Sequence, residues 1–181
     1  MKFIVTPQSI PDVLLIEPTV FTDDRGYFKE SYNLKDFEEF LPDVKFVQDN
    51  ESKSSRGVLR GLHFQKPPYA QAKLIRVIQG SIWDVAVDIR PDSPGFKHYC
   101  FAELTADDHF QFFIPCGFAH GFIVISDTAI VQYKTDNFYE PASDASIHPH
   151  DPSINIPWPI PKKDHLLSDK DKMLPFLADS L

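Results

Sequence analysis

The chain has 181 residues, enough for one domain, over residues 1–181, with a sizeable hydrophobic core. Its 43% apolar content and its 16 phenylalanines exclude a disordered chain. The formal net charge of −8, from 18 basic and 26 acidic residues, argues against non-specific binding to nucleic acid or to an acidic membrane surface. No apolar stretch approaches the roughly 18 residues of a membrane span, and residues 1–12 lack the apolar run of a signal peptide.

Most of the predicted regular structure is strand, because short segments rich in β-branched and aromatic residues recur along the chain. Helices are predicted only over residues 33–41, capped by Asn33, and from Ser168, where Asp171 three residues on resembles a capping box. The predicted strands are 27–32, 45–49, 58–65, 73–78, 81–89, 99–104, 110–114, 119–125 and 129–135.

Residues 81–89 alternate most clearly between two faces. Trp83, Val85 and Val87 lie on one face, while Asp84 and Asp88 lie on the other. Two acids on one face of a strand that is apolar on the other indicate either a polar lumen or a solvent-facing surface.

Prolines gather at the C-terminal end, where seven of the 16 occur from Pro141 onwards. Such a segment is expected to wrap over a surface without regular structure. Many short strands, few short helices and a Pro-rich C-terminal segment predict an all-β fold: a sandwich, barrel or jelly roll.

The two cysteines, Cys100 and Cys116, are not in a CxxC arrangement. This spacing favours neither a zinc site nor a disulfide framework. We interpret them as free thiols of a protein in the reducing cytoplasm.

Two segments, 57–65 and 115–122, place titratable residues inside otherwise apolar strands. His63 follows Gly57 by six positions, and the second segment has the pattern P-x-G-x-x-H that ends at His120. Both resemble the paired histidine motifs of the cupin superfamily, which implies a cupin-like jelly-roll barrel with a site in its mouth. In cupins the first motif continues with a second histidine and a glutamate. Here that histidine position is Gln65, and no glutamate follows before Gly80.

This departure predicts that the site holds no metal. Glutamine is a poor ligand for Fe, Mn or Zn, and Lys73 would place a positive charge beside any cation. A histidine that binds no metal is available as an acid or base near neutral pH. In an undistorted strand Arg60 and His63 would face opposite sides, so either a β-bulge at Gly61 brings both inward or one of the two is not a site residue.

Five motifs in register resemble one family within this superfamily, the dTDP-4-dehydrorhamnose 3,5-epimerases. The resemblance covers about residues 13–172, which is nearly the whole chain. Each motif is weak alone, but the common order and spacing are specific. The motifs are residues 22–30, 48–50, 56–65, 79–90 and 167–171.

The resemblance implies inversion at C3 and C5 of dTDP-4-dehydro-6-deoxy-D-glucose without a cofactor, because the 4-keto group acidifies both neighbouring C–H bonds. His63 falls at the position of the base and Tyr133 at that of the proton donor; a phenol is protonated at pH 7. Lys73 would stabilise the enolate, and Asp171 would hydrogen-bond His63 and fix its tautomer. The alternatives are that Asp171 is the helix-capping acid and that Tyr133 is a packed core aromatic. Asp84 is either a second partner of the histidine or lysine, or a solvent-facing residue.

The remaining site residues implied by the resemblance bind the nucleotide and the sugar. Arg suits bidentate phosphate recognition. Tyr139 could stack on the base or simply pack, and Lys170 could bind substrate or be an idle surface lysine. This chain has Asp144 where the family has a glutamate, and Pro149–His150 where it has a Trp-Asn pair, which we interpret as surface loop variation. The expected binding residues are Arg25, Glu30, Gln48, Asp49, Asn50, Arg60, Lys73, His120, Tyr139, Asp144 and Lys170.

The resemblance also implies a homodimer that exchanges an N-terminal strand, which would protect the exposed edges of a small jelly roll. The closest alternatives are a mono-epimerase at C3 or C5 and a 4-keto-to-3-keto isomerase, against which Tyr133 argues. Less favoured are a metal-dependent cupin oxygenase, because of Gln65, and a non-catalytic sugar-nucleotide binding module.

Overall fold

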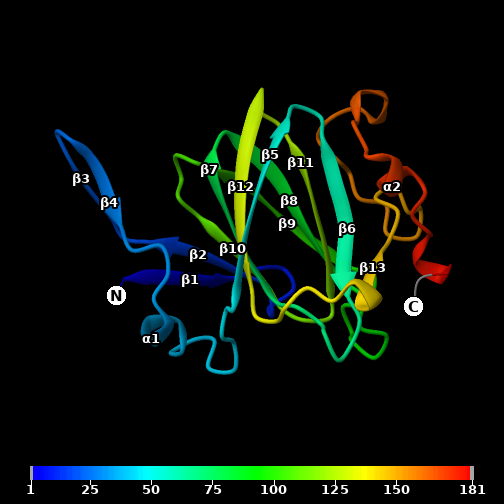
Figure 1. The fold of residues 1–181 in the computed structure, drawn as a ribbon, viewed down its shortest axis with the longest axis horizontal. Coiled ribbons are helices and arrows are strands. Elements are labelled where there is room, and N and C mark those ends of the chain that lie inside the picture. Colours follow the sequence, from blue (N-terminus) through cyan, green and yellow to red (C-terminus); the bar gives the residue numbers. More distant parts are fainter. Residues whose placement is uncertain (1, 180–181) are drawn as a thin grey trace.

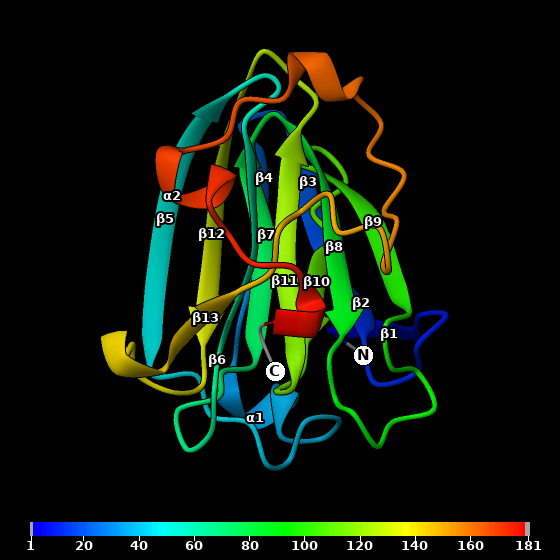
Figure 2. The ribbon, with the colours of Figure 1, turned by 90° about the vertical axis from the view of Figure 1, so that its right-hand side faces the viewer.

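Two antiparallel sheets lie face to face and form the body of the protein (Figures 1 and 2). The computed structural model describes residues 2–179. Within this range no helix has both the length and the apolar character needed to span a bilayer. The all-β prediction is confirmed, and the short helices lie outside the two sheets.

The larger sheet has six strands in the order β1-β2-β10-β7-β12-β5. Its outer face is covered at one end by the first helix, α1, and the turn after it, from which Phe37 and Leu41 pack against Ile16, Leu74 and Phe113. The strands are β1 (Phe3–Pro7), β2 (Leu14–Pro18), β5 (Gln48–Ser55), β7 (Lys73–Gln79), β10 (Gln111–Ile114) and β12 (Thr128–Thr135), and α1 spans Leu34–Phe37.

The smaller sheet has five strands in the order β13-β6-β11-β8-β9. A separate two-stranded hairpin, β3–β4, projects from the body on the left of Figure 1. The strands are β3 (Val20–Asp23), β4 (Gly26–Lys29), β6 (Leu59–Gln65), β8 (Ser81–Asp88), β9 (Tyr99–Thr105), β11 (Phe118–Val124) and β13 (Asp144–Ser146).

The main core fills the space between the two sheets. Ile75 and Val131 of the larger sheet meet Ile82, Ala86 and Phe122 of the smaller one. The predicted alternation of β8 is confirmed: Ile82 and Ala86 face this core, while Trp83, Val85 and Val87 belong to a second cluster on the outer face.

The C-terminal strap, residues 147–179, covers the outer face of the smaller sheet, as the orange and red segment in Figure 2 shows. Ile147, Ile154, Ile160 and Leu177 are its buried contacts. The strap contains the helix α2 (Asp169–Lys172) and 3-10 helices at Lys162–Asp164 and Leu177–Asp179; a further 3-10 helix, Pro141–Ser143, precedes it. The prediction of a wrapping Pro-rich segment is therefore confirmed.

The interpretation of Pro149–His150 as surface loop variation is wrong. The His150 ring is half-buried and stacks on His165 with ring centroids 5.0 Å apart. The His150 Nε2 lies 2.8 Å from the His165 Nδ1, and the Pro149 carbonyl accepts a hydrogen bond from the Trp158 indole. These contacts join residues 149–150 to Trp158 and His165 within the strap.

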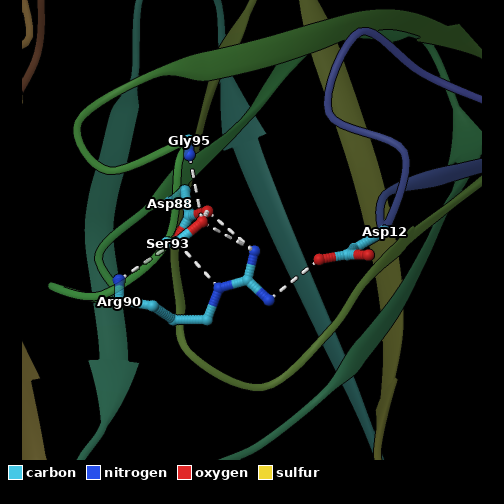
Figure 3. Close-up of polar contacts among 5 residues, drawn as sticks. All are labelled: Asp12, Asp88, Arg90, Ser93 and Gly95. Carbon is cyan, nitrogen blue, oxygen red and sulfur yellow. Dashed lines mark hydrogen bonds and ion pairs between the residues drawn. The ribbon is translucent and has the colours of Figure 1, made fainter.

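Asp88 is fully buried at the end of β8, so it is not a solvent-facing residue. Its carboxylate accepts hydrogen bonds from the Arg90 guanidinium at 2.7–2.9 Å and from the Ser93 hydroxyl at 2.5 Å (Figure 3). Arg90 also pairs with Asp12 at 2.8 Å. Although burial alone would raise the pKa of Asp88, the bonds from Arg90 and Ser93 lower it. This network ties the loop after β8 to the segment before β2.

The predicted helices are shorter than expected, but their caps are confirmed. Asn33 accepts a hydrogen bond from the Lys35 amide, and Ser168 accepts one from the Asp171 amide at 3.0 Å. Predicted strand 27–32 is the shorter β4, and 45–49 begins later, as β5. The strands β1, β2, β3 and β13 were not predicted; each of the first two is only five residues long and ends at a proline, and β13 has three residues.

Candidate active site

A cavity of about 410 Å³ opens between the two sheets, a volume typical of small-molecule sites. Strands of both sheets contribute to it, together with the loop that follows β12 and the lysine at the start of α2. It is lined by Gln48, Asn50, Ser52, Arg60, His63, Phe64, Gln65, Gln71, Lys73, His120, Phe122, Tyr133, Tyr139, Asp144 and Lys170.

A bulge in β6 brings both Arg60 and His63 into this cavity. His63 lies opposite His120 of β11, whereas Arg60 lies opposite Phe122, so β6 has one more residue than β11 between these pairs. Gly61 adopts a φ of +127°, and a Cβ there would lie 2.5 Å from the Gly121 Cα. The alternative with a bulge is confirmed, and glycine is required because the two strands approach so closely.

Both ring nitrogens of His63 have a partner. The Nε2 lies 3.2 Å from a carboxylate oxygen of Asp171, and the Nδ1 lies 2.8 Å from the Ser146 hydroxyl. Burial alone would raise the pKa of Asp171, but its hydrogen bond with His63 and the charge of that ring lower it. An ionised carboxylate only accepts, so neutral His63 carries its hydrogen on Nε2 and its lone pair on Nδ1.

Asp171 reaches His63 because the strap returns along β6. The Leu166 backbone bonds with Gly57 at 2.8 Å and with Leu59 at 3.0 Å, which docks the chain beside the start of the strand. Ser168 then begins α2, and the buried Asp171 side chain points to His63. Because its carboxylate contacts His63, Asp171 is not only a helix-capping acid.

The opposite wall of the cavity, formed by the larger sheet, carries Tyr133 on β12 and Lys73 on β7. Burial raises the pKa of Tyr133, although the charge of Arg60 opposes the shift. The phenol is therefore protonated at neutral pH. An imidazole on one wall thus faces a protonated phenol on the other.

Lys73 is a buried cation at the side of the cavity. Its ammonium donates a hydrogen bond to the His63 carbonyl at 3.2 Å. Burial lowers the pKa of Lys73 to about 8, while the charges of Asp84 and Asp144 act in the opposite direction. A cation in this dry position stabilises a negative oxygen far better than one in water.

His120 and Asp84 form a second histidine–carboxylate pair inside the barrel. The His120 Nε2 lies 2.5 Å from one carboxylate oxygen of Asp84. Burial lowers the pKa of His120 in spite of this acid. The other carboxylate oxygen of Asp84 has no hydrogen-bond partner among residues 2–179. Asp84 is therefore hydrogen-bonded to His120 and not to His63, and it is not a solvent-facing residue.

These side chains do not fit a cupin metal. The Gln65 amide is hydrogen-bonded to the backbone, the His120 Nε2 is bonded to Asp84, and the Lys73 cation lies alongside. Within the part of the chain that the structure describes, no three His, Cys, Asp or Glu side chains form a group that could hold a metal ion.

Comparison with known proteins identifies the family of the chain. The family model described as dTDP-4-dehydrorhamnose 3,5-epimerase matches residues 7–179. The chain is 54% identical over 168 residues to the dTDP-4-dehydrorhamnose 3,5-epimerase of Shigella flexneri, with 92% of each chain covered. The chain belongs to the dTDP-4-dehydrorhamnose 3,5-epimerase family.

Solved structures of the epimerase family have the same fold. The enzyme of Elizabethkingia anophelis NUHP1 has a TM-score of 0.94 at 49% identity, covering 99% of this chain and 98% of that one. A dTDP-6-deoxy-D-glucose-3,5-epimerase of Legionella pneumophila Philadelphia 1, in complex with dTDP-4-keto-L-rhamnose, has a TM-score of 0.94 at 43% identity, covering 98% and 94%. A 3'-monoepimerase of Streptomyces bikiniensis has a TM-score of 0.88 at 33% identity, covering 95% and 87%. These similarities confirm the predicted cupin-like jelly-roll fold.

Most residues expected from the epimerase resemblance line the cavity, but four do not. Asp171 contacts His63 without lining the cavity itself. Asp49 lies on the outer face of β5 and pairs with Lys134 at 2.8 Å, because its neighbours Gln48 and Asn50 face inward. Contrary to expectation, Asp49 therefore does not line this cavity. Arg25 and Glu30 lie on and just after the projecting hairpin, away from the cavity of their own chain.

The family motifs did not reveal Ser54 or Ser146, and revealed Gln65 only as a missing metal ligand. Ser54 accepts a hydrogen bond from the Arg60 side chain at 3.0 Å, and Ser146 contacts His63. Period-two alternation in residues 48–55 could have shown that Ser54 faces inward. The contact of Ser146 depends on a three-residue strand that no local pattern indicates.

Proposed function

We propose that the chain catalyses the 3,5-epimerisation of dTDP-4-dehydro-6-deoxy-D-glucose to dTDP-4-dehydro-L-rhamnose. The observation that carries the proposal is the placement of His63 and Tyr133 on opposite walls of one cavity, with Lys73 between the sheets. Inversion needs removal of a proton from one face of a carbon and its return to the other face. The geometry supplies a group for each step.

In each half of the reaction His63 takes the proton from a carbon next to the 4-keto group. The C–H electron pair forms a double bond to C4 while the π pair of the carbonyl moves to its oxygen, and the Lys73 cation stabilises the resulting enolate oxygen. The enolate then collapses and takes a proton from Tyr133 on the opposite face. Solvent reprotonates Tyr133 and removes the proton from His63, so no electron acceptor is required.

The remaining cavity residues suit the nucleotide. The Arg60 guanidinium provides the charge and fork geometry that bind diphosphate. Gln48 and Asn50 present amides that are already linked at 2.9 Å, and Tyr139 presents an aromatic face at the rim. Lys170 pairs with Asp144 at 2.7 Å, so both reach the cavity as an ion pair.

The first test is incubation of chelator-treated protein with the 4-keto sugar nucleotide in D2O, followed by mass spectrometry. Two deuterons, at C3 and C5, are expected in the product. One deuteron would instead establish a mono-epimerase or a ketoisomerase. Binding without exchange would establish a non-catalytic module, and loss of turnover that Fe or Mn restores would revive the metal-dependent alternative.

Activity is expected to fall as the pH rises above about 8, because the Lys73 cation is lost there. Burial is the main cause of this low pKa, and the charged form, which stabilises the enolate, is present below it. The pH dependence of kcat/KM measures this fall, which forms the alkaline limb of the profile. Lys73→Arg should remove the limb because arginine stays charged, whereas Lys73→Met should lower the rate at every pH. Persistence of the limb in Lys73→Arg would assign it to another group.

We infer that two copies of the chain form a homodimer in which the hairpin β3–β4 of one subunit completes the cavity of the other. Support comes from exposed aromatic side chains on the hairpin: Phe21 is 63% exposed, Tyr27 60% and Phe28 68%. Such a surface is uncommon on a solitary protein. The hairpin also carries Arg25 away from the site of its own chain.

Mixing two inactive variants tests this arrangement. A hybrid of an Arg25→Ala chain and a His63→Ala chain has one intact site only if Arg25 acts across the interface. We therefore expect activity to return after the subunits are exchanged, with dimers measured by analytical ultracentrifugation. An inactive mixture in which hybrids have formed would place Arg25 at its own site.

The free thiols support a reducing compartment, the cytoplasm, as the place of action. Cys100 is buried and Cys116 exposed, and neither is in a disulfide. An exposed free thiol is typical of proteins kept in reducing surroundings.

A further inference from the structure

The loop between β12 and the 3-10 helix Pro141–Ser143 carries Tyr139 at the rim of the cavity. The Tyr139 side chain is 54% exposed and lines the cavity, so little packing holds it in place. An exposed loop samples several conformations unless its backbone is anchored. What anchors this backbone therefore determines where the tyrosine ring lies.

The side chain of Gln65 makes the two hydrogen bonds that flank Tyr139, while Gln71 and Thr135 donate to the Asn137 carbonyl earlier in the loop. The Gln65 amide oxygen accepts a hydrogen bond from the Glu140 amide at 2.7 Å, and its amide nitrogen donates to the Phe138 carbonyl at 3.1 Å. The two bonds hold the residues on both sides of Tyr139. The same nitrogen donates to the Tyr69 carbonyl at 2.7 Å, which ties in a second loop.

Gln48 completes the arrangement, since its side-chain oxygen accepts a hydrogen bond from the Tyr139 amide at 3.2 Å. Gln65 itself is only 6% exposed and lies on the rigid strand β6, two residues from His63. Both of its amide hydrogens bind carbonyl oxygens, so glutamine is required as donor and acceptor at once. With its amide held by backbone groups, Gln65 acts on a ligand through the loop.

We propose that Gln65 is a positioning residue that holds Tyr139 ready to stack on the nucleobase of the substrate. The inference rests on the proposed function, because it assumes a nucleotide in this cavity. The strand β6 then serves both halves of the substrate: His63 is placed at the sugar, and Gln65 braces the loop at the base. Loss of the brace weakens nucleotide binding and leaves proton transfer intact.

The test is a double-mutant cycle read out by calorimetric titration with dTDP and by steady-state kinetics. Gln65→Met keeps the size and neutrality of the side chain but removes its hydrogen bonds. We expect it to weaken dTDP binding about tenfold, within the range for loss of one base–aromatic stack, and to leave kcat within about twofold. In a Tyr139→Ala background the same change should have no further effect. Gln79→Met, at the exposed end of β7, is the matched control.

Three results would overturn the inference. Equal weakening of dTDP binding by Gln65→Met in both backgrounds would mean that Gln65 acts directly or through the whole fold. A fall in kcat with unchanged dTDP affinity would place it in the chemistry. If wild-type protein does not bind dTDP, the proposed function fails and this inference fails with it. Should Gln65→Met not fold, Gln65→Glu provides the same cycle, because a carboxylate retains the size but lacks both donors.

Discussion

Replacement of His63 by alanine is expected to abolish epimerisation while leaving dTDP binding nearly unchanged. Its imidazole is the only base that this mechanism uses on its wall of the cavity, and loss of such a group costs about 10²–10⁴-fold in rate. The nucleotide contacts assigned to Gln48, Asn50 and Tyr139 come from the opposite sheet and its loop, so they remain. Deuterium exchange into the substrate and calorimetric titration with dTDP measure the two effects separately.

His63→Asn serves as a second variant, because it retains a hydrogen-bonding group opposite the buried Asp171 carboxylate. An uncompensated buried acid destabilises a fold, and the asparagine amide reduces that penalty. Both variants should retain the native circular dichroism spectrum and thermal transition of the wild type. If either loses the fold, His63 has a structural role; if either retains exchange at the wild-type rate, another group is the base.

Tyr133→Phe is expected to separate proton removal from proton return. Without the phenol, His63 still removes a proton, but return of a proton on the opposite face is impaired, by about 10²–10⁴-fold. Exchange of substrate hydrogens with D2O should therefore continue while formation of the L-configured product nearly stops. Nuclear magnetic resonance of the recovered sugar nucleotide follows both quantities in one sample.

A matched control is Tyr99→Phe, which removes a hydroxyl from β9 outside the cavity. Its product formation should equal that of the wild type. Full product formation by Tyr133→Phe would refute the role of the phenol as acid. Loss of exchange together with loss of product would show instead that Tyr133 is needed for proton removal or for substrate binding.

Local patterns were sufficient for the central strands. β8 alternates so regularly that both of its faces could be assigned, and the cores on its two sides confirm that assignment. The parity conflict between Arg60 and His63 also indicated the bulge at Gly61. These features were predictable because period-two alternation and glycine chemistry are properties of a few neighbouring residues.

Contacts between segments far apart in the sequence could not be predicted from such local patterns. The Ser146 hydroxyl meets His63 across 83 positions, and Gln65 reaches Glu140 across 75. The position of Asp49 could have been predicted, since alternation in β5 places it opposite to Gln48 and Asn50. The position of Arg25 depends on how the hairpin leaves the two sheets, which no local pattern determines.

The path of the strap separates two events during synthesis of the chain: closure of the two sheets and the arrival of Asp171 beside His63. All strands of both sheets end by Ser146, whereas Asp171 lies near the end of the described chain. Since chains fold from their N-terminal part as they emerge from the ribosome, the two sheets can close around the cavity before the carboxylate partner of His63 is available. A nascent or truncated chain would therefore possess a nucleotide pocket without a complete base. On the proposed mechanism, catalysis would begin only when the strap has folded back over the smaller sheet, so the arrangement couples the onset of activity to folding of the strap.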